Sequence, residues 1–206
     1  MRSILISATI LLLALSAAAQ TDSEYDPESE PVHQAFGDLN KDGKEDLVTL
    51  TPIPSAEDSV AGFLCYKLVA FLGDGDGNFE PWKTYDKSIV VPLNDFISYD
   101  LSLSVKRGSI HIEVGEFASA GSWSSDNYTF VFRYQNDDFY LIGHEHDSFA
   151  RNTGKGEKNS FNHLTHKKLT TTYNAFDDNV PQRSKWSDIP EAPLRPLSKF
   201  FLPDEI

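Results

Sequence analysis

Apolar residues recur at every second position through the middle of the chain, which is the period of a β-strand with one buried face. Four segments show this alternation: LSLSV (101–105), SIHIEV (109–114), YTFVFRY (128–134) and DFYLIG (138–143). Lys106-Arg107-Gly108 separates the first two segments, and Gln135-Asn136-Asp137 separates the last two. The pattern therefore predicts two successive hairpins made of four antiparallel strands.

An earlier segment, GFLCYKLVAFLG (62–73), is apolar on both faces and predicts a central strand. GDGDGN (73–78) follows as a glycine-rich turn into FEPW. No segment sustains a period of 3.6 residues over three turns. We therefore expect a single all-β domain over residues 35–175, an antiparallel meander of hairpins that resembles propeller blades.

The first 19 residues predict a secretory signal peptide, because Arg2 precedes a short apolar run and Ala17 and Ala19 form an A-x-A cleavage pattern. The alternative, a membrane anchor, needs about 20 apolar residues, which is more than this run offers. We expect a secreted or periplasmic protein with no membrane span after cleavage.

Two segments outside the domain have compositions that disfavour regular structure. Residues 20–34, QTDSEYDPESEPVHQ, are acidic and contain proline, which predicts a disordered leader. Residues 176–206 predict an irregular, proline-rich tail packed on the domain surface. The prolines of this tail are Pro181, Pro190, Pro193, Pro196 and Pro203.

Charge and cysteine content limit the partners and the chemistry. The chain has 31 Asp and Glu against 18 Lys and Arg, and loss of Arg2 with the signal peptide leaves 17 basic residues and a net charge of −14. Such a chain repels nucleic acid and anionic lipid, so we expect neither as a partner. Cys65 is the only cysteine, which excludes an intrachain disulfide, and its apolar neighbours favour a small buried residue over a nucleophile.

The stretch FGDLNKDGKEDLVTL (36–50) places oxygen donors at alternate positions of a short loop. If Asp38 is position one, side-chain oxygens also fall at positions three, five and nine, and a backbone carbonyl is available at position seven. A hard cation such as Ca²⁺ binds six to eight oxygens in this way, and Gly43 at position six permits the sharp reversal. The candidate ligands are Asp38, Asn40, Asp42, Lys44 through its carbonyl, and Asp46.

This loop has two possible interpretations other than an EF-hand. Thr49 stands at position twelve, where an EF-hand has a bidentate glutamate, and DLVTL after the loop has β-strand character, so the site is a loop that leads into a strand. The other alternative is a polar turn without metal. The later GDGDGN lacks the glycine and the last ligand of such a loop, which favours a hairpin turn there.

FGDLNKDGKEDLVTL resembles the FG-GAP or VCBS repeat of integrin α subunits and of many secreted bacterial proteins. The matching elements are Phe36-Gly37, the D-x-N-x-D-G-x-x-D loop and the strand start at Leu47-Val48, and FLGDGDGNFEPW resembles the closing hairpin of the repeat. The resemblance covers residues 35–83 and implies a structural Ca²⁺ ion. The remainder resembles uncharacterised secreted bacterial proteins that carry one such repeat, and it implies no activity. A full propeller of four or more blades does not fit in about 187 residues.

Histidines and aromatic residues supply the remaining candidates. His144 and His146 share one face of an extended segment, and with His163 or His166 they offer Zn²⁺ ligands, although solvated surface positions are the alternative. The aromatic side chains of Trp82, Trp123 and Tyr128 stack on sugar rings if they are exposed, whereas packing in the core is their commoner role.

No nucleophile motif, zinc-protease motif or phosphate-binding glycine loop occurs in the chain. We therefore expect a non-enzymatic binding or interaction module with one structural calcium loop and an unknown protein or glycan partner. The alternatives are a metal-dependent hydrolase centred on the second-half histidines and a carbohydrate-binding module that uses exposed aromatic residues.

Overall fold

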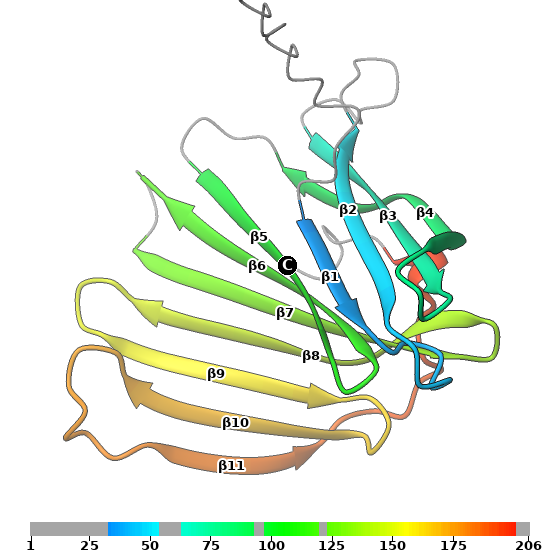
Figure 1. The fold of residues 1–206 in the computed structure, drawn as a ribbon. Coiled ribbons are helices and arrows are strands. Elements are labelled where there is room, and N and C mark those ends of the chain that lie inside the picture. Colours follow the sequence, from blue (N-terminus) through cyan, green and yellow to red (C-terminus); the bar gives the residue numbers. More distant parts are fainter. Residues whose placement is uncertain (1–32, 54–62, 93–96, 120–122, 201–206) are drawn as a thin grey trace, which may run out of the picture.

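The computed structural model describes residues 33–53, 63–92, 97–119 and 123–200 (Figure 1). The predicted signal peptide and most of the predicted leader lie outside these residues. The leader prediction extends to residue 34, yet the first strand begins at His33. Within the described part of the chain, no helix has the length and apolar character needed to cross a membrane.

The N-terminal half forms a four-stranded antiparallel sheet in the order β1-β2-β3-β4. Its strands are β1 (His33–Gly37), β2 (Asp46–Ile53), β3 (Phe63–Gly73) and β4 (Phe79–Pro92). The segment that is apolar on both faces becomes β3, which has a neighbouring strand on each side. The prediction of a central strand is therefore confirmed.

The rest of the chain forms a seven-stranded antiparallel sheet in the order β11-β10-β9-β8-β7-β6-β5. Its strands are β5 (Ile97–Lys106), β6 (Ser109–Ala118), β7 (Ser124–Gln135), β8 (Asp138–Ala150), β9 (Lys155–Asn162), β10 (Lys167–Asn174) and β11 (Arg183–Asp188). The 3₁₀ turn η1 (Leu197–Lys199) follows.

Tight turns fix the two predicted hairpins. Arg107 and Gly108 connect β5 to β6 with φ of 54° and 72°, and Asn136 and Asp137 connect β7 to β8 with φ of 49° and 65°. Two successive left-handed residues make the turn whose twist matches that of paired strands. Both hairpin predictions are confirmed.

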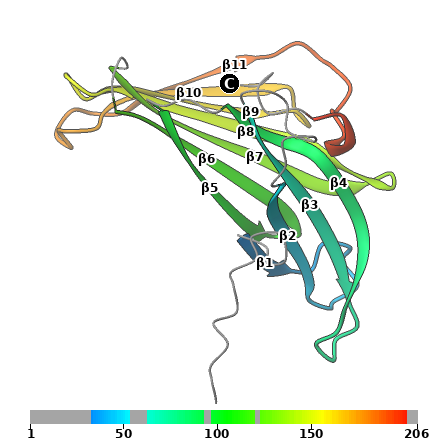
Figure 2. The same cartoon turned by 90° about the horizontal axis from the view of Figure 1, so that it is seen from above.

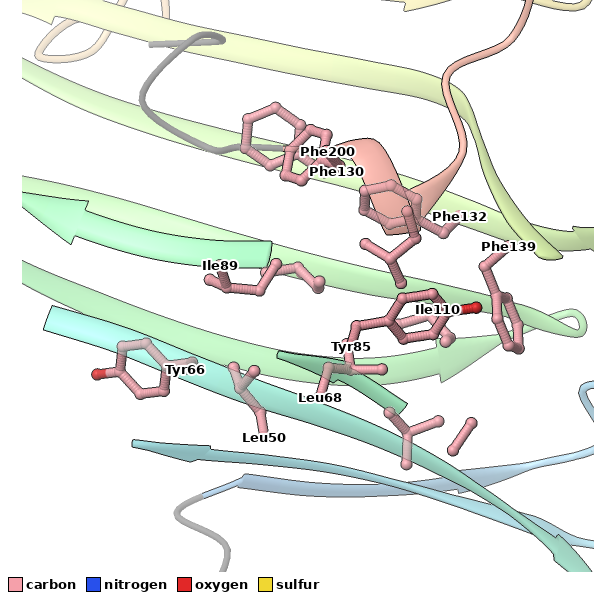
Figure 3. Packing of buried hydrophobic residues seen from close by; sticks show 14 of the residues in the cluster. Leu50, Tyr66, Leu68, Tyr85, Ile89, Ile110, Phe130, Phe132, Phe139 and Phe200 are labelled. Atoms are coloured by element: carbon pink, nitrogen blue, oxygen red, sulfur yellow. The ribbon is translucent and has the colours of Figure 1, made fainter. Parts of the chain in front are cut away.

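The two sheets pack face to face along part of their length, and the strands of the larger sheet extend beyond the smaller one (Figure 2). The core between them contains Leu50 and Ile89 from the smaller sheet and Ile110, Phe130 and Phe132 from the larger sheet (Figure 3). Cys65 is also buried. The all-β antiparallel prediction is confirmed, but both sheets are open, so the propeller-like arrangement is not.

The C-terminal tail is more ordered than its prolines predict. Residues 183–188 contain no proline and pair with β10 as the edge strand β11, which corrects the prediction of a wholly irregular tail. An edge strand tolerates flanking prolines because only one side of it needs backbone donors. Further on, Leu197 and Phe200 are buried in the core, where the Phe200 ring packs edge-on against Phe130 and Phe132 (Figure 3).

Candidate functional site

Asp46, the first residue of β2, is fully buried, and both of its carboxylate oxygens accept backbone hydrogen bonds. The Leu39 N–H donates to Oδ2 at 2.8 Å, and the Gly73 N–H donates to Oδ1 at 3.0 Å. A Cβ atom on Gly73 would lie 1.9 Å from the Glu45 carbonyl oxygen, so only glycine permits this approach. Asp46 therefore ties the β1–β2 loop to the end of β3.

Asp38 holds the curl of the β1–β2 loop. One of its carboxylate oxygens accepts the Lys41 N–H at 2.6 Å, and the other accepts the Gly43 N–H at 3.0 Å. Lys41 and Gly43 have φ of 66° and 85°, so two residues of this short loop adopt the left-handed conformation. Glycine adopts this conformation without strain, as the sequence predicted for position six.

Asn40 and Asp42 lie further out on the same loop and bond to each other. The Asn40 side-chain amide donates to one Asp42 oxygen at 2.9 Å, and the Lys44 N–H donates to the other at 2.8 Å. These two bonds lower the pKa of Asp42 below its ordinary value, and the bond from Asn40 has the larger effect. The Asp42 carboxylate is therefore ionised at neutral pH and exposed to solvent.

The chemistry of this donor set fits a calcium ion, because every donor is a hard oxygen on one curled loop. In the structure the side-chain oxygens of this set accept hydrogen bonds from N–H groups. Among the described residues, no three His, Cys, Asp or Glu side chains are grouped to hold a metal ion. A carboxylate oxygen that accepts one N–H keeps a second lone pair. Asn40 and Asp42 would have to exchange their mutual hydrogen bond for the ion.

The neighbouring 73–78 loop is a hairpin turn, as predicted. Asp74 accepts hydrogen bonds from the Asn78 side-chain amide at 2.6 Å and from the Asp76 backbone N–H at 2.7 Å. These bonds, with that from the Asn78 side chain as the largest contribution, lower the pKa of Asp74. Asp74 is thus bonded within its own turn, which connects β3 to β4.

A β-bulge at Ile142 decides where the histidines of β8 lie. Phe132 pairs with Leu141 but Val131 pairs with Gly143, so Ile142 is the extra residue. The bulge moves His144 and His146 onto the face that carries Phe130 and Phe132, which we call the inner face of the seven-stranded sheet. Without the extra residue these histidines would point to the opposite face.

His146 forms an ion-pair-type contact on the inner face. Its Nε2 lies 2.9 Å from Asp126 Oδ1, and its ring stacks in parallel on Tyr128 with the ring centres 4.4 Å apart. Burial alone would raise the pKa of Asp126, but hydrogen bonds from Ser124, Ser148 and His146 lower it. Asp126 is therefore ionised.

Glu116 is the cross-strand partner of Asp126, and its pKa is shifted in the opposite direction. Burial, and then the negative charge of Asp126, raise the pKa of Glu116. The inner face thus carries two neighbouring carboxyl groups of which one protonates more readily than the other.

His144 and His163 form a second pair. His144 Nδ1 lies 2.9 Å from His163 Nε2, and the His144 ring stacks on Phe161 with the ring centres 4.1 Å apart. Burial, and then the nearby His163, lower the pKa of His144 to about 4, and burial lowers that of His163. His144, His146 and His163 are half-buried and paired, so the interpretation of solvated histidines is wrong for these three.

The aromatic candidates have different surroundings. Trp82 is half-buried and packs on Tyr134 and Phe139, with ring centres 4.3 Å and 5.6 Å apart, so it belongs to the core. Trp123 is 75% exposed. The sequence did not single out Trp186, which is 65% exposed on the edge strand β11. Of the three tryptophans, Trp123 and Trp186 therefore present their indole rings to solvent.

Trp123 stands at the end of an open groove of about 610 Å³ on the inner face. The polar side chains of the groove come from four neighbouring strands, and they are Ser124, His146, Ser148, Lys155, Glu157, Asn159 and Thr172. The parts of β7, β8, β9 and β10 that line the groove belong to the region of the seven-stranded sheet that extends beyond the smaller sheet (Figure 2). Sequence spacing gives no sign of it, since its members are brought together by strand register.

Comparison with known protein families, with curated proteins and with solved structures gives no match. The resemblance of residues 35–83 to the FG-GAP or VCBS repeat therefore stays a prediction, and the residues of this chain carry the functional argument.

Proposed function

We propose that this protein is an exported, non-enzymatic binding module in which one calcium ion stabilises the 38–46 loop. The observation that carries the proposal is the donor set of that loop: three carboxylates, one side-chain amide and one carbonyl within nine residues. The positive φ angles of Lys41 and Gly43, which curl the loop, support it. Export is inferred from the pattern of the first 19 residues.

The ion would be held by Asp38, Asn40, Asp42, the Lys44 carbonyl and Asp46. It would supply positive charge to three carboxylates that otherwise repel each other, and so it would order the loop. The net charge of the mature chain favours cation binding in general. Because the loop lacks the bidentate glutamate of an EF-hand, we expect weak binding, with a dissociation constant of about 0.1–1 mM.

The test is thermal unfolding of the mature protein, first in EDTA and then in calcium. Calcium at 100 times its dissociation constant is expected to stabilise the folded state by about 2.7 kcal/mol. Asp42→Ala removes one exposed ligand and is expected to lose most of that shift. Asp76→Ala, an exposed aspartate of the neighbouring turn, is the matched control and is expected to keep it.

Two outcomes contradict the calcium proposal. One is an unchanged melting temperature when calcium replaces EDTA in the wild-type protein. The other is an equal calcium shift in wild type and in Asp42→Ala. Magnesium serves as the ion control, because its preference for octahedral geometry and retained water gives it a smaller effect on a loop of this kind.

A further inference from the structure

The inner-face groove has the composition of a site for a ligand that is both ringed and hydroxyl-rich. Its polar members include three hydroxyl groups, an amide, a carboxylate, an ammonium and an imidazole, so donors and acceptors are both present. An exposed indole stands at its end. Ligand sites combine a flat apolar surface with a few fixed polar groups in this way.

The charges of the groove balance, although the protein as a whole is strongly acidic. Lys155 and Glu157 both line the groove and carry opposite charges. Asp126 does not line the groove, and its carboxylate lies 2.9 Å from His146 Nε2. A groove without a dominant charge favours a neutral ligand over a phosphate, a nucleic acid or a polyamine.

The polar groups of the groove are held in position before any ligand arrives. Asn159 donates through its side-chain amide to Glu157 at 2.8 Å, and Asn159 accepts a hydrogen bond from the Thr170 hydroxyl at 2.8 Å. His146 is fixed between Asp126 and the Tyr128 ring. Preorganised groups lose little conformational freedom on binding, which favours affinity.

The backbone of Trp123 is also fixed, while its ring remains in solvent. The Arg151 N–H donates to the Trp123 carbonyl at 2.7 Å. The Arg151 guanidinium in turn donates to the Ala118 carbonyl at 2.7 Å and lies over the Phe117 ring at 5.0 Å. The backbone at Trp123 is therefore tied to the ends of β6 and β8, and its exposed indole offers a flat apolar surface of the kind on which a sugar ring stacks.

We propose that the inner-face groove binds a neutral oligosaccharide, with Trp123 stacking on a sugar ring and Glu157, Asn159 and Thr172 bonding to its hydroxyl groups. This inference rests on the proposed role as a binding module and names its ligand. It is independent of calcium in its chemistry, since no residue of the 38–46 loop lines the groove.

The test is titration calorimetry of the mature protein with four neutral hexasaccharides: cellohexaose, xylohexaose, chitohexaose and maltohexaose. At least one is expected to bind saturably. Trp123→Ala is expected to weaken that binding about tenfold or more, because tryptophans are prominent among the residues whose truncation costs the most binding energy. Trp123→Phe keeps a smaller ring and is expected to lose less.

Trp186→Ala is the matched control, because Trp186 is similarly exposed but lies on the opposite face. Its strand neighbour Lys185 pairs with Thr170, and Thr170 pairs with Asn159 of the groove, so Trp186 points away from it. Trp186→Ala is expected to bind the sugar as wild type does. Unchanged melting temperatures of both variants show that neither change affects folding.

Three outcomes overturn the sugar proposal: no saturable binding by any of the four hexasaccharides, equal loss in the Trp123→Ala and Trp186→Ala variants, or preference for an anionic hexagalacturonate. Titrations in EDTA and in calcium separate the two proposals. A preserved calcium shift without sugar binding overturns this inference alone, and sugar binding without a calcium shift overturns the calcium proposal alone.

Discussion

Replacing Asp46 by alanine removes a side chain that joins the β1–β2 loop to the end of β3. The carboxylate is fully buried, and it accepts hydrogen bonds from the Leu39 and Gly73 backbone N–H groups at 2.8 Å and 3.0 Å. Both donors are buried as well, so bulk solvent does not reach them in the folded protein. The variant therefore leaves two backbone donors without partners in the interior.

The magnitude follows from those two donors. Each buried N–H that loses its acceptor costs about 1–3 kcal/mol, so Asp46→Ala is expected to lower the free energy of unfolding by about 2–6 kcal/mol. A domain of this size has a total stability of about 5–15 kcal/mol, so the change is large. Asp46→Asn keeps one acceptor oxygen, and its loss is expected to be intermediate.

The assay is urea unfolding of the mature chain in EDTA, followed by tryptophan fluorescence. Chelation removes any contribution of calcium, so only the hydrogen bonds of Asp46 are measured. The control is Asp42→Ala, whose exposed carboxylate bonds only within its own loop. Asp42→Ala is expected to change the stability by less than about 0.5 kcal/mol in EDTA. If Asp46→Ala also stays within that limit, Asp46 has no structural role apart from calcium and the reasoning fails.

Two further predictions concern the tail and the histidines. Phe200→Ala is expected to lower the free energy of unfolding by about 3–5 kcal/mol, because Phe200 is buried against Phe130 and Phe132, and urea unfolding checks it. Because the pKa of His144 is about 4 in the folded protein and about 6.5 when unfolded, the unfolded state binds the proton first and stability falls as the pH is lowered from 7 towards 4. His144→Gln is expected to reduce the loss of unfolding free energy between pH 7 and pH 5, which urea unfolding at both pH values measures. An equal loss in the variant and the wild-type protein would contradict this prediction.

The strands of this fold are readable in the sequence because one face of each hairpin is buried. Period-two alternation and two-residue turns that tolerate left-handed residues define β5 to β8 without any tertiary information. β11 was not predicted because its neighbours Pro181 and Pro190 suggest irregular structure. Its pairing with β10 depends on contacts between residues that are distant in the sequence, and local strand propensity does not predict such contacts.

The groove could not be predicted, because one extra residue changes the face of every side chain that follows it. With regular alternation from Phe139 and Leu141, the inner face would carry Glu145 and Asp147. The bulge at Ile142 places His144 and His146 there instead. The only local sign is Gly143, where a Cβ atom would lie 2.8 Å from the Phe161 carbonyl oxygen, and a single glycine in a strand does not fix the register.

The 38–46 loop, which connects two strands of the smaller sheet, and the groove lie near opposite ends of the long strands of the seven-stranded sheet, and this separation limits what a bound calcium ion would do. The 38–46 loop contacts the β5–β6 turn, since a Cβ atom on Gly108 would lie 3.0 Å from the Asp38 carbonyl oxygen. The start of β7 and the end of β8, which line the groove, lie beside the other end of β6, where Glu116 pairs with Asp126 (Figure 1). The ten residues of β6 span about 30 Å at roughly 3.3 Å per residue. Coupling over that distance requires an element with two alternative arrangements. A continuous hydrogen-bonded strand is not such an element, so calcium is expected to raise the stability of the protein without changing its affinity for sugar.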